Sequence, residues 1–383
     1  MIAKVKSWFE AAPARRLDFS SAHGEPSVWE VLLMFVAVSL IHVLTVCRVA
    51  HFWDAALRSY DTGQYLRLAA FIGSWGSRGG RVPYHFWGFP YAIAAVSKLL
   101  PISQLAALVT ISEVSSLAVC VLLRGLYGGW VAAAFVAIHY QWVVLSVEGG
   151  SEPLFICLLF ASFLAARTGR WNVAACLASL STTVRPVGVF ALAGFAIVLG
   201  MRRSYRQLAA ITLIGLGVGT LYVIPLWMLR GTPFANFAGY RAEDWGPHGR
   251  PLVYPFGTLI PSYFGGFGLG WPVLAFSASW LVVLLVGTVA IWLPRNVQRF
   301  SRGRQVEALF ASMYALFLIS YNMDTIVLHL PRFVIPVLPL ILFSLRDWIP
   351  KDRRVLWTVG ALSALLASSA MVGFKNVFGF RLR

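Results

Sequence analysis

Long apolar stretches fill most of the chain, and short polar or basic connections separate them. A helix that crosses a bilayer needs about 20 consecutive apolar residues, because each residue adds about 1.5 Å through a hydrocarbon core about 30 Å thick. The pattern predicts an all-α, polytopic bundle that forms one transmembrane domain over residues 1–383, with about eleven spans. These are expected near residues 28–47, 103–123, 129–147, 152–166, 170–184, 187–201, 207–229, 272–293, 306–322, 333–346 and 354–373.

Basic residues gather in alternate connections between the predicted spans. The clusters are Arg124; Arg167 and Arg170; Arg202, Arg203 and Arg206; Arg295, Arg299, Arg302 and Arg304; and Arg346, Lys351, Arg353 and Arg354. Short connections rich in Lys and Arg stay on the cytoplasmic side of a membrane. The pattern therefore predicts a cytoplasmic arm over residues 1–27, with the N-terminus in the cytoplasm and the C-terminus outside.

Two long connections then face outward, over residues 48–102 and 230–271. The first contains a helical run, a glycine-rich turn and the aromatic segment 84–100. A span over that segment would move every later arginine cluster outside, so an amphipathic helix at the membrane interface is expected instead. The second connection is rich in proline, glycine and aromatic residues, which indicates a folded loop at the level of the lipid headgroups.

Composition agrees with a lipid environment. Hydrophobic residues make up 58% of the chain and charged residues 12%, whereas soluble domains average about 45–50% and about 25%. The formal net charge of +17 is accounted for by connections that meet anionic headgroups, and no nucleic-acid-binding module is present. The four cysteines lie in or beside apolar stretches and are expected to pack as small hydrophobic residues.

Charged residues that fall on the predicted outer face need a reason, because ionisable groups at membrane depth are costly and usually face a cavity. They come from separate segments and include both signs: Asp54, Asp61, Glu148, Glu152, Arg185, Glu243, Asp244, Asp324 and Arg332. One interpretation is a pocket for a charged ligand. The other is mutual ion pairing that holds the bundle together.

Asp61 is the most informative of these residues. In a helix over residues 58–72 it would share a face with Leu57, Tyr65, Leu68 and Ile72. A carboxylate on a buried face is unfavourable unless a charged or hydrogen-bonding group meets it. Asp61 is therefore expected to have either a structural partner or a ligand.

One carboxylate and several arginines suit a particular chemistry. Transfer of a sugar to an alcohol needs a base that takes the acceptor proton. A lipid phosphate leaves as a fairly stable anion, which cations stabilise, and the planar fork of arginine binds phosphate through two hydrogen bonds. The seven histidines lack metal-ligand spacing, so no cofactor is expected, although a divalent cation shared by Asp54 and Asp61 stays open.

Six short motifs resemble one family in residue type and in order. They are YDTGQYLRLA (60–69), FWGFPYAIAAVSKLL (86–100), GGSEPLFICLLF (149–160), TVRPVG (183–188), YRAEDWG (240–246) and RFVIPVLP (332–339). Together they resemble integral-membrane glycosyltransferases of the GT-C superfamily, above all the second mannosyltransferase of GPI-anchor synthesis and its bacterial relatives. Two positions depart from the family pattern: Tyr60 replaces a tryptophan, and Pro186 follows Arg185.

The resemblance implies an inverting transferase that moves a sugar, expected to be mannose, from a polyprenyl-phosphate donor to a hydroxyl of a lipid or glycan acceptor. It implies Asp61 as general base on the non-cytoplasmic face, and it favours a bacterial plasma membrane over an endoplasmic-reticulum membrane. The residues implied to bind substrate are Arg58, Tyr65, Ser151, Glu152, Arg185, Tyr240, Trp245 and Arg332.

Three other functions stay open. A transporter or flippase of a phosphate-linked lipid would also need an apolar cavity with arginines, but it would need polar cavity residues at both faces. Another GT-C enzyme, such as an aminoarabinose transferase or a protein O-mannosyltransferase, would use a different acceptor. A structural subunit of a larger membrane complex would use its aromatic residues to fill helix interfaces.

Overall fold

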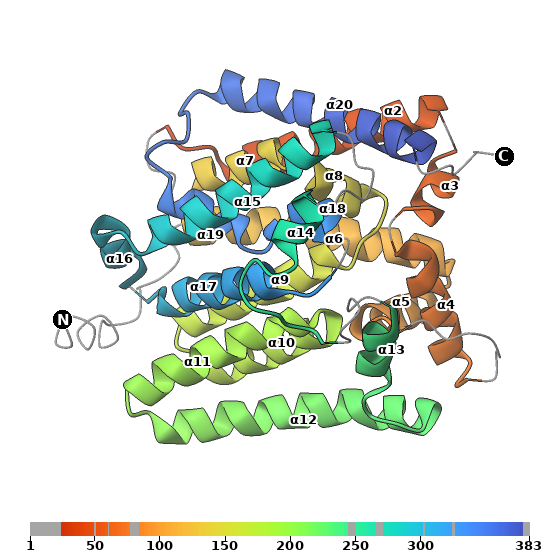
Figure 1. Cartoon of the computed structure of the whole chain (residues 1–383), viewed down its shortest axis with the longest axis vertical. Coiled ribbons are helices and arrows are strands. Elements are labelled where there is room, and N and C mark those ends of the chain that lie inside the picture. The colour runs from red at the N-terminus through yellow and green to blue at the C-terminus, as the bar shows by residue number, and fades with distance from the viewer. Residues whose placement is uncertain are drawn as a thin grey trace. The chain divides into compact units, whose positions relative to one another are not determined.

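The computed structural model describes residues 24–49, 51–59, 61–76, 84–243, 250–264, 271–301, 303–323 and 326–377. Within these ranges the regular structure is helical, apart from one isolated bridge between Leu252 and Tyr321 (Figure 1). The all-α prediction is therefore confirmed.

Contacts divide the chain into two compact units. The Asp61 unit comprises Leu17–Ser74, Pro90–Cys157 and Arg346–Arg383, and the Arg185 unit comprises Met1–Arg16, Trp75–Phe89 and Leu158–Leu345.

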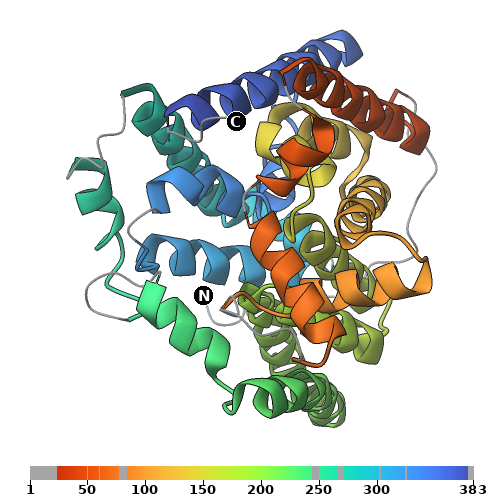
Figure 2. The ribbon, with the colours of Figure 1, turned by 90° about the vertical axis from the view of Figure 1, so that its right-hand side faces the viewer.

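The Asp61 unit contains two helices that pack side by side although they come from opposite ends of the chain, α2 and α20 (Figures 1 and 2). Its helices are α2 (Val28–Val49), α3 (Phe52–Leu57), α4 (Thr62–Gly73), most of α5 (Gly88–Leu99), α6 (Gln104–Tyr127), α7 (Gly129–Ile138), α8 (Tyr140–Val147), the beginning of α9 (Glu152–Arg167), and α20 (Arg353–Val377).

The Arg185 unit contains the rest of α9 and a stack of three helices, α10, α11 and α12 (Figure 1). Its further elements are α10 (Trp171–Val184), the 3-10 helix η1 (Pro186–Gly188), α11 (Val189–Met201), α12 (Tyr205–Arg230), α13 (Ala235–Glu243), α14 (Leu259–Phe264), α15 (Trp271–Ile291), α16 (Pro294–Ser301), α17 (Gln305–Ser320), α18 (Ile326–Val334) and α19 (Leu338–Ser344).

Helix α2 begins at a capping box. The hydroxyl of Ser27 accepts a hydrogen bond from the backbone N–H of Glu30, and the Glu30 carboxylate accepts one from the backbone N–H of Ser27. This reciprocal pair satisfies two N–H groups that a helix start leaves without partners. It explains why the apolar run becomes helical at Val28.

Four described helices are long and apolar enough to cross a membrane, and six spans result if each of two bent pairs counts as one. The predicted count of about eleven therefore stays a prediction. Two of the expected spans are not single straight helices in the structure. Residues 129–147 form α7 and α8 with an 81° bend at His139, and α18 and α19 are bent by 60°. Pro336 lies in the second break, where its missing N–H cannot continue a helix.

The His139 bend occurs without proline or glycine. The His139 side chain is fully buried, and its Nδ1 accepts a hydrogen bond from the backbone N–H of Trp142. The imidazole thereby caps the first turn of α8, which lets a new helix begin in another direction.

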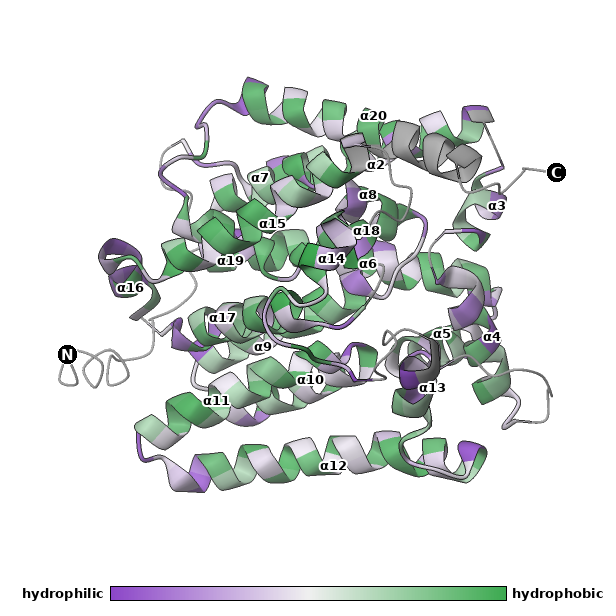
Figure 3. Cartoon of the chain, in the orientation of Figure 1, coloured by the Kyte–Doolittle hydropathy of each residue, from purple (hydrophilic) through white to green (hydrophobic). Residues whose placement is uncertain are grey.

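Basic connections lie together at one end of each unit. In the Asp61 unit Arg124 donates to the carbonyl of Pro26, and Arg353 forms an ion pair with Glu30 at 2.9 Å. In the Arg185 unit Arg167 and Arg202 each bond to the beginning of α17. Polar residues lie mainly near helix ends and in connections, while apolar residues line the helices (Figure 3). These contacts agree with the predicted grouping of connections; the membrane side that each group faces stays a prediction.

The two predicted outer loops contain short helices. Helix α5 falls within the aromatic segment 84–100, and its 12 residues extend about 18 Å, too little to span a bilayer. In the second loop the backbone of residues 251–256 bonds to residues 319–322 at the end of α17, and Asn322 bonds to both Thr258 and the carbonyl of Arg250. The described part of this loop is therefore folded.

Candidate functional site

Asp61 lies immediately before α4 and not in the interior of a helix, which corrects the expected continuous helix over residues 58–72. Helix α3 ends at Leu57, and α4 begins at Thr62. The Asp61 carbonyl accepts hydrogen bonds from the N–H groups of Gln64 and Tyr65 at 2.9 and 3.0 Å. Aspartate is favoured at this position because the helix start carries partial positive charge. The half-buried Asp61 carboxylate does not cap the helix itself.

The first turns of α4 present the predicted face to the interior of the unit. Tyr65 is 6% exposed and Leu68 is fully buried. Ile72 is half-buried, whereas Leu57, on the separate helix α3, is exposed. Tyr65, Leu68 and Ile72, which follow Asp61, therefore share the predicted face on α4. Leu57, which precedes Asp61, does not share it, because the helix is broken before α4.

A tight turn over residues 148–152 meets this face. The Thr62 hydroxyl donates to the carbonyl of Gly149 at 3.1 Å, and the hydroxyls of Tyr65 and Ser151 lie 3.0 Å apart. Thr62 and Gly149 are 87 residues apart in the sequence. Two of the predicted motifs, YDTGQYLRLA and GGSEPLFICLLF, are therefore brought together by buried hydrogen bonds.

Glycine is required at the centre of this turn. Gly149 has φ +91°, a conformation that residues with a Cβ rarely adopt. A Cβ at this position would lie 1.9 Å from Cδ2 of Leu108 on α6. Glycine therefore lets the turn approach α6 closely.

Ser112 of α6 holds the neighbouring residue of the turn. Its hydroxyl lies 2.9 Å from the carbonyl of Gly150 and accepts a hydrogen bond from the Gly150 N–H. One helical turn further along α6, the Ser116 hydroxyl donates to Ser146 of α8. Sequence reasoning missed Ser112 and Thr62; the polar run SEVSS inside a predicted span was the available signal.

The side chains of His42 and Glu148 join α2 to the same turn. His42 Nε2 lies 3.1 Å from Glu148 Oε1, and both side chains are fully buried. Glu148 Oε2 has no hydrogen-bond partner among the described residues. The structure thus gives a fully buried histidine in the middle of α2 a specific partner on the turn.

The turn lies deep along the helices of the Asp61 unit. His42 is about 21 Å along α2 from Val28, and Ser112 is about 18 Å along α6 from Arg124, at the helical rise of about 1.5 Å per residue. The turn is therefore well removed from the basic end of this unit. Polar groups at such depth are costly unless they are hydrogen-bonded, and Glu148 Oε1, the carbonyls of Gly149 and Gly150 and the Ser151 hydroxyl all have partners.

Glu152 is fully buried in the first turn of α9. A Cβ on Gly150 would lie 2.9 Å from Glu152 Oε2, so this carboxylate lies over the turn that precedes it. A helix start favours a negative charge. Arg58, in contrast, is exposed at the end of α3.

Three predicted residues belong to the Arg185 unit. Arg185 is half-buried between α10 and η1, with an extended backbone that the following Pro186 favours. Arg332 is 4% exposed in the last turn of α18. Tyr240 is half-buried on α13. Trp245 lies outside the described residues.

Tyr240 belongs to an aromatic cluster between the two predicted outer loops. Its ring lies 4.8 Å from that of Tyr84 and 5.6 Å from that of Phe86. Asn236 of α13 donates to the carbonyl of His85 at 2.7 Å. The segment that precedes α5 is therefore anchored on α13, which explains why both loops are ordered there.

Within the described ranges no group of three or more His, Cys, Asp and Glu side chains is suited to a metal ion. Asp54 lies on α3 and Asp61 before α4. A cation shared by two acids at two-turn spacing would require both to lie on one continuous helix. The two acids do not lie on one continuous helix.

Comparison with known proteins identifies the fold. No family model matches the sequence, and no curated protein matches it. The structure is similar to the crystal structure of ArnT from Cupriavidus metallidurans in the apo state, with a TM-score of 0.50 and 14% identity. The match covers 89% of this chain and 75% of ArnT. The chain thus has an all-helical fold similar to that of ArnT over most of its length.

Proposed function

We propose that this protein transfers a sugar from a polyprenyl-phosphate donor to a hydroxyl group of a lipid or glycan acceptor. The observation that carries the proposal is the meeting of the Asp61 helix with the 148–152 turn through Tyr65 and Ser151. The fold supports it, because ArnT is a transferase of aminoarabinose that is carried on undecaprenyl phosphate. The motif order favours mannose as the sugar.

Asp61 is the general base in this proposal. Its carboxylate takes the proton of the acceptor hydroxyl while the acceptor oxygen bonds to the anomeric carbon. The bond between that carbon and the phosphate oxygen breaks on the opposite side, so the configuration is inverted. The half-buried position of Asp61 supports this role, since a base must be reachable and yet partly shielded from water.

The polyprenyl phosphate leaves as an anion. Arg185 and Arg332 are proposed to bind this phosphate, because guanidinium groups bind phosphate oxygens in a bidentate manner. Ser151, Glu152 and Tyr65 are proposed to contact the sugar or the acceptor. Arg58, Tyr240 and Trp245 are proposed as further substrate contacts near the membrane surface.

The test is the substitution Asp61→Asn, with Asp54→Asn as a matched control on the neighbouring helix α3. Purified protein is incubated with added acceptor lipids and with polyprenyl-phosphate mannose, polyprenyl-phosphate glucose or polyprenyl-phosphate aminoarabinose, and glycosylated acceptor and released polyprenyl phosphate are measured by mass spectrometry. Asp61→Asn should lower the rate by about 100-fold or more, as loss of a general base does. Asp54→Asn should keep the wild-type rate.

Donor-dependent release by the wild type identifies the sugar. Unchanged turnover by Asp61→Asn would exclude Asp61 as the base. Movement of intact donor across a vesicle membrane, without any release of polyprenyl phosphate, would instead establish a flippase.

A further inference from the structure

Helix α6 of the Asp61 unit carries a glutamate in its middle, although this helix is long and apolar enough to cross a membrane. Glu113 lies about 14 Å along the axis from Gln104 and about 21 Å from Tyr127, at the helical rise of about 1.5 Å per residue. Its side chain is half-buried. An ionisable group at such depth is costly, and it indicates a functional contact with a partner.

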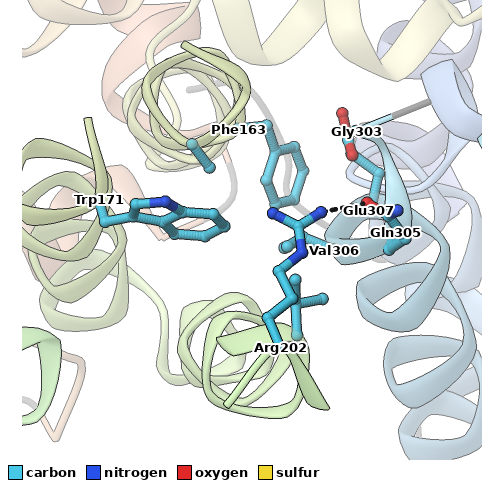
Figure 4. Close-up of a pocket in the computed structure, with 9 residues that line it drawn as sticks. Phe163, Trp171, Arg202, Gly303, Gln305, Val306 and Glu307 are labelled. Carbon is cyan, nitrogen blue, oxygen red and sulfur yellow. Dashed lines mark hydrogen bonds between the residues drawn. The ribbon is translucent and has the colours of Figure 1, made fainter. Parts of the chain in front are cut away.

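Charged groups of the Arg185 unit show how this cost is usually met. In the region that Figure 4 shows, Arg202 donates to Gln305 Oε1 at 3.4 Å. Close by, Arg167 donates through Nε to Glu307 Oε1 at 2.8 Å, and both side chains are buried. Among the described residues, in contrast, none bonds to the carboxyl group of Glu113 or forms an ion pair with it. A partner for this carboxyl group in the membrane would therefore come from another molecule.

The surface beside Glu113 suits the approach of another helix. Thr110, Val114 and Val121 are exposed, and Leu117 is half-buried. Their successive spacings of four, three and four residues put these side chains on one face of α6. Glu113 borders this face, one helical turn from both Thr110 and Leu117. The spacing is that of a seam between two helices, and the small threonine side chain permits their close approach.

A second copy of this chain offers a matching group at the same depth. In a dimer with its twofold axis normal to the membrane, equivalent residues lie at the same level, and those near the axis meet each other. A carboxyl group in its acid form both donates and accepts a hydrogen bond, so two Glu113 side chains can satisfy each other.

The basic residues of a second copy do not offer this contact. In the four described helices that are long enough to span a membrane, Lys and Arg occur only in the first or last turn. No lysine or arginine of these helices therefore lies at the depth of Glu113, whereas the Glu113 of a second copy does. The complementary group on a second copy is thus the same acid.

We propose that α6 is the interface of a dimer, in which the Glu113 side chains of two copies pair through hydrogen bonds between their carboxyl groups. The face formed by Thr110, Val114, Leu117 and Val121 packs against the same face of the second copy. Hydrogen bonds between side chains stabilise helix association in lipid, because no water is present to bond to an unpaired polar group. The proposal does not depend on the proposed sugar transfer.

The experiment measures dimerisation of the full-length protein in lipid vesicles, by energy transfer between two labelled pools as added lipid dilutes the protein. Glu113→Leu removes the hydrogen bonds and should weaken dimerisation about tenfold. Glu113→Gln keeps a donor and an acceptor in a side chain of similar size and should stay within about threefold of the wild type. Thr212→Leu makes a polar-to-apolar change at an exposed position of α12, and it should leave dimerisation unchanged.

Oxidative cross-linking locates the contact, because a disulfide forms only where two Cα atoms come within about 7 Å. Val114 and Leu213 are exposed to a similar extent, 60% and 68%, on α6 and α12. In a background with Cys47→Ser, Val114→Cys should give a disulfide-linked dimer, and Leu213→Cys should not.

The unfolding temperature separates association from a structural role within one copy. At a protein concentration where the chain is monomeric in detergent, Glu113→Leu should not lower this temperature, since it removes an unpaired acid from an apolar environment. A lower temperature, a wild type that stays monomeric at every lipid ratio, or unchanged dimerisation of Glu113→Leu would overturn the proposal. Cross-linking of Val114→Cys to a different protein in cell membranes, without the dimer, would also overturn it.

Discussion

At the residue scale, buried polar pairs decide which side chains can be exchanged. His42 and Glu148 are both fully buried and lie 3.1 Å apart, so each is the counterpart that makes the other tolerable in an apolar interior. Removing one partner of a buried pair leaves an uncompensated polar or charged group, whereas removing both is often neutral. The sequence of α2 does not reveal this pair, because a histidine in an apolar helix could equally pack against neighbouring side chains without a charged partner.

His42→Leu should lower the free energy of unfolding by about 3–5 kcal/mol, because Glu148 would lose its partner in the interior. The double variant His42→Leu with Glu148→Leu should lose less than the sum of the two single variants. Thermal and denaturant unfolding in one detergent measure all three. Additive losses would show that the two side chains do not interact.

At the scale of elements, turns decide the site more than the helices do. The capping box predicts where α2 begins, and the aspartate before α4 explains where that helix begins, since both satisfy N–H groups at a helix start. The 148–152 turn has no such local rule. Its conformation depends on Thr62, Ser112 and Tyr65, which come from helices distant in the sequence.

Gly149→Ala tests this turn, with Gly169→Ala as its matched control. Both glycines have positive φ, +91° and +76°, so both variants carry similar backbone strain of about 1–2 kcal/mol. A Cβ at Gly169 meets nothing within 4 Å, while one at Gly149 would collide with Leu108. Gly149→Ala should therefore lower the unfolding temperature by more, and equal shifts would argue against close packing of the turn on α6.

At the scale of the whole molecule, the basic connections meet in groups. Arg124 and Arg353 contact the segment at the beginning of α2, and Arg167 and Arg202 meet the beginning of α17. Positive residues stay on the cytoplasmic side because translocating them is unfavourable. The prediction that these groups face the cytoplasm, and that residues 230–271 face outward, belongs to this scale.

Cysteine labelling in intact cells checks that orientation. Thr168 lies in a basic connection and Thr232 in the second predicted outer loop, and both are exposed. In a background with Cys47→Ser, a membrane-impermeant maleimide should label Thr232→Cys from outside, and Thr168→Cys only after the cells are opened. The reverse pattern would place the Arg185 unit in the opposite orientation.

The sequence by itself determined the membrane class, the all-helical fold, the grouping of the basic connections and Asp61 as a residue of interest. These follow from periodicity, span length and the cost of charge in lipid, which are local properties of the chain. Only the tertiary structure decided that α4 begins after Asp61, that the predicted span over 129–147 bends at His139, and that His42, Ser112 and Thr62 hold the 148–152 turn. Such contacts join residues as much as 106 positions apart, and a sequence pattern does not show which distant hydroxyl, imidazole or carbonyl will satisfy a buried polar group.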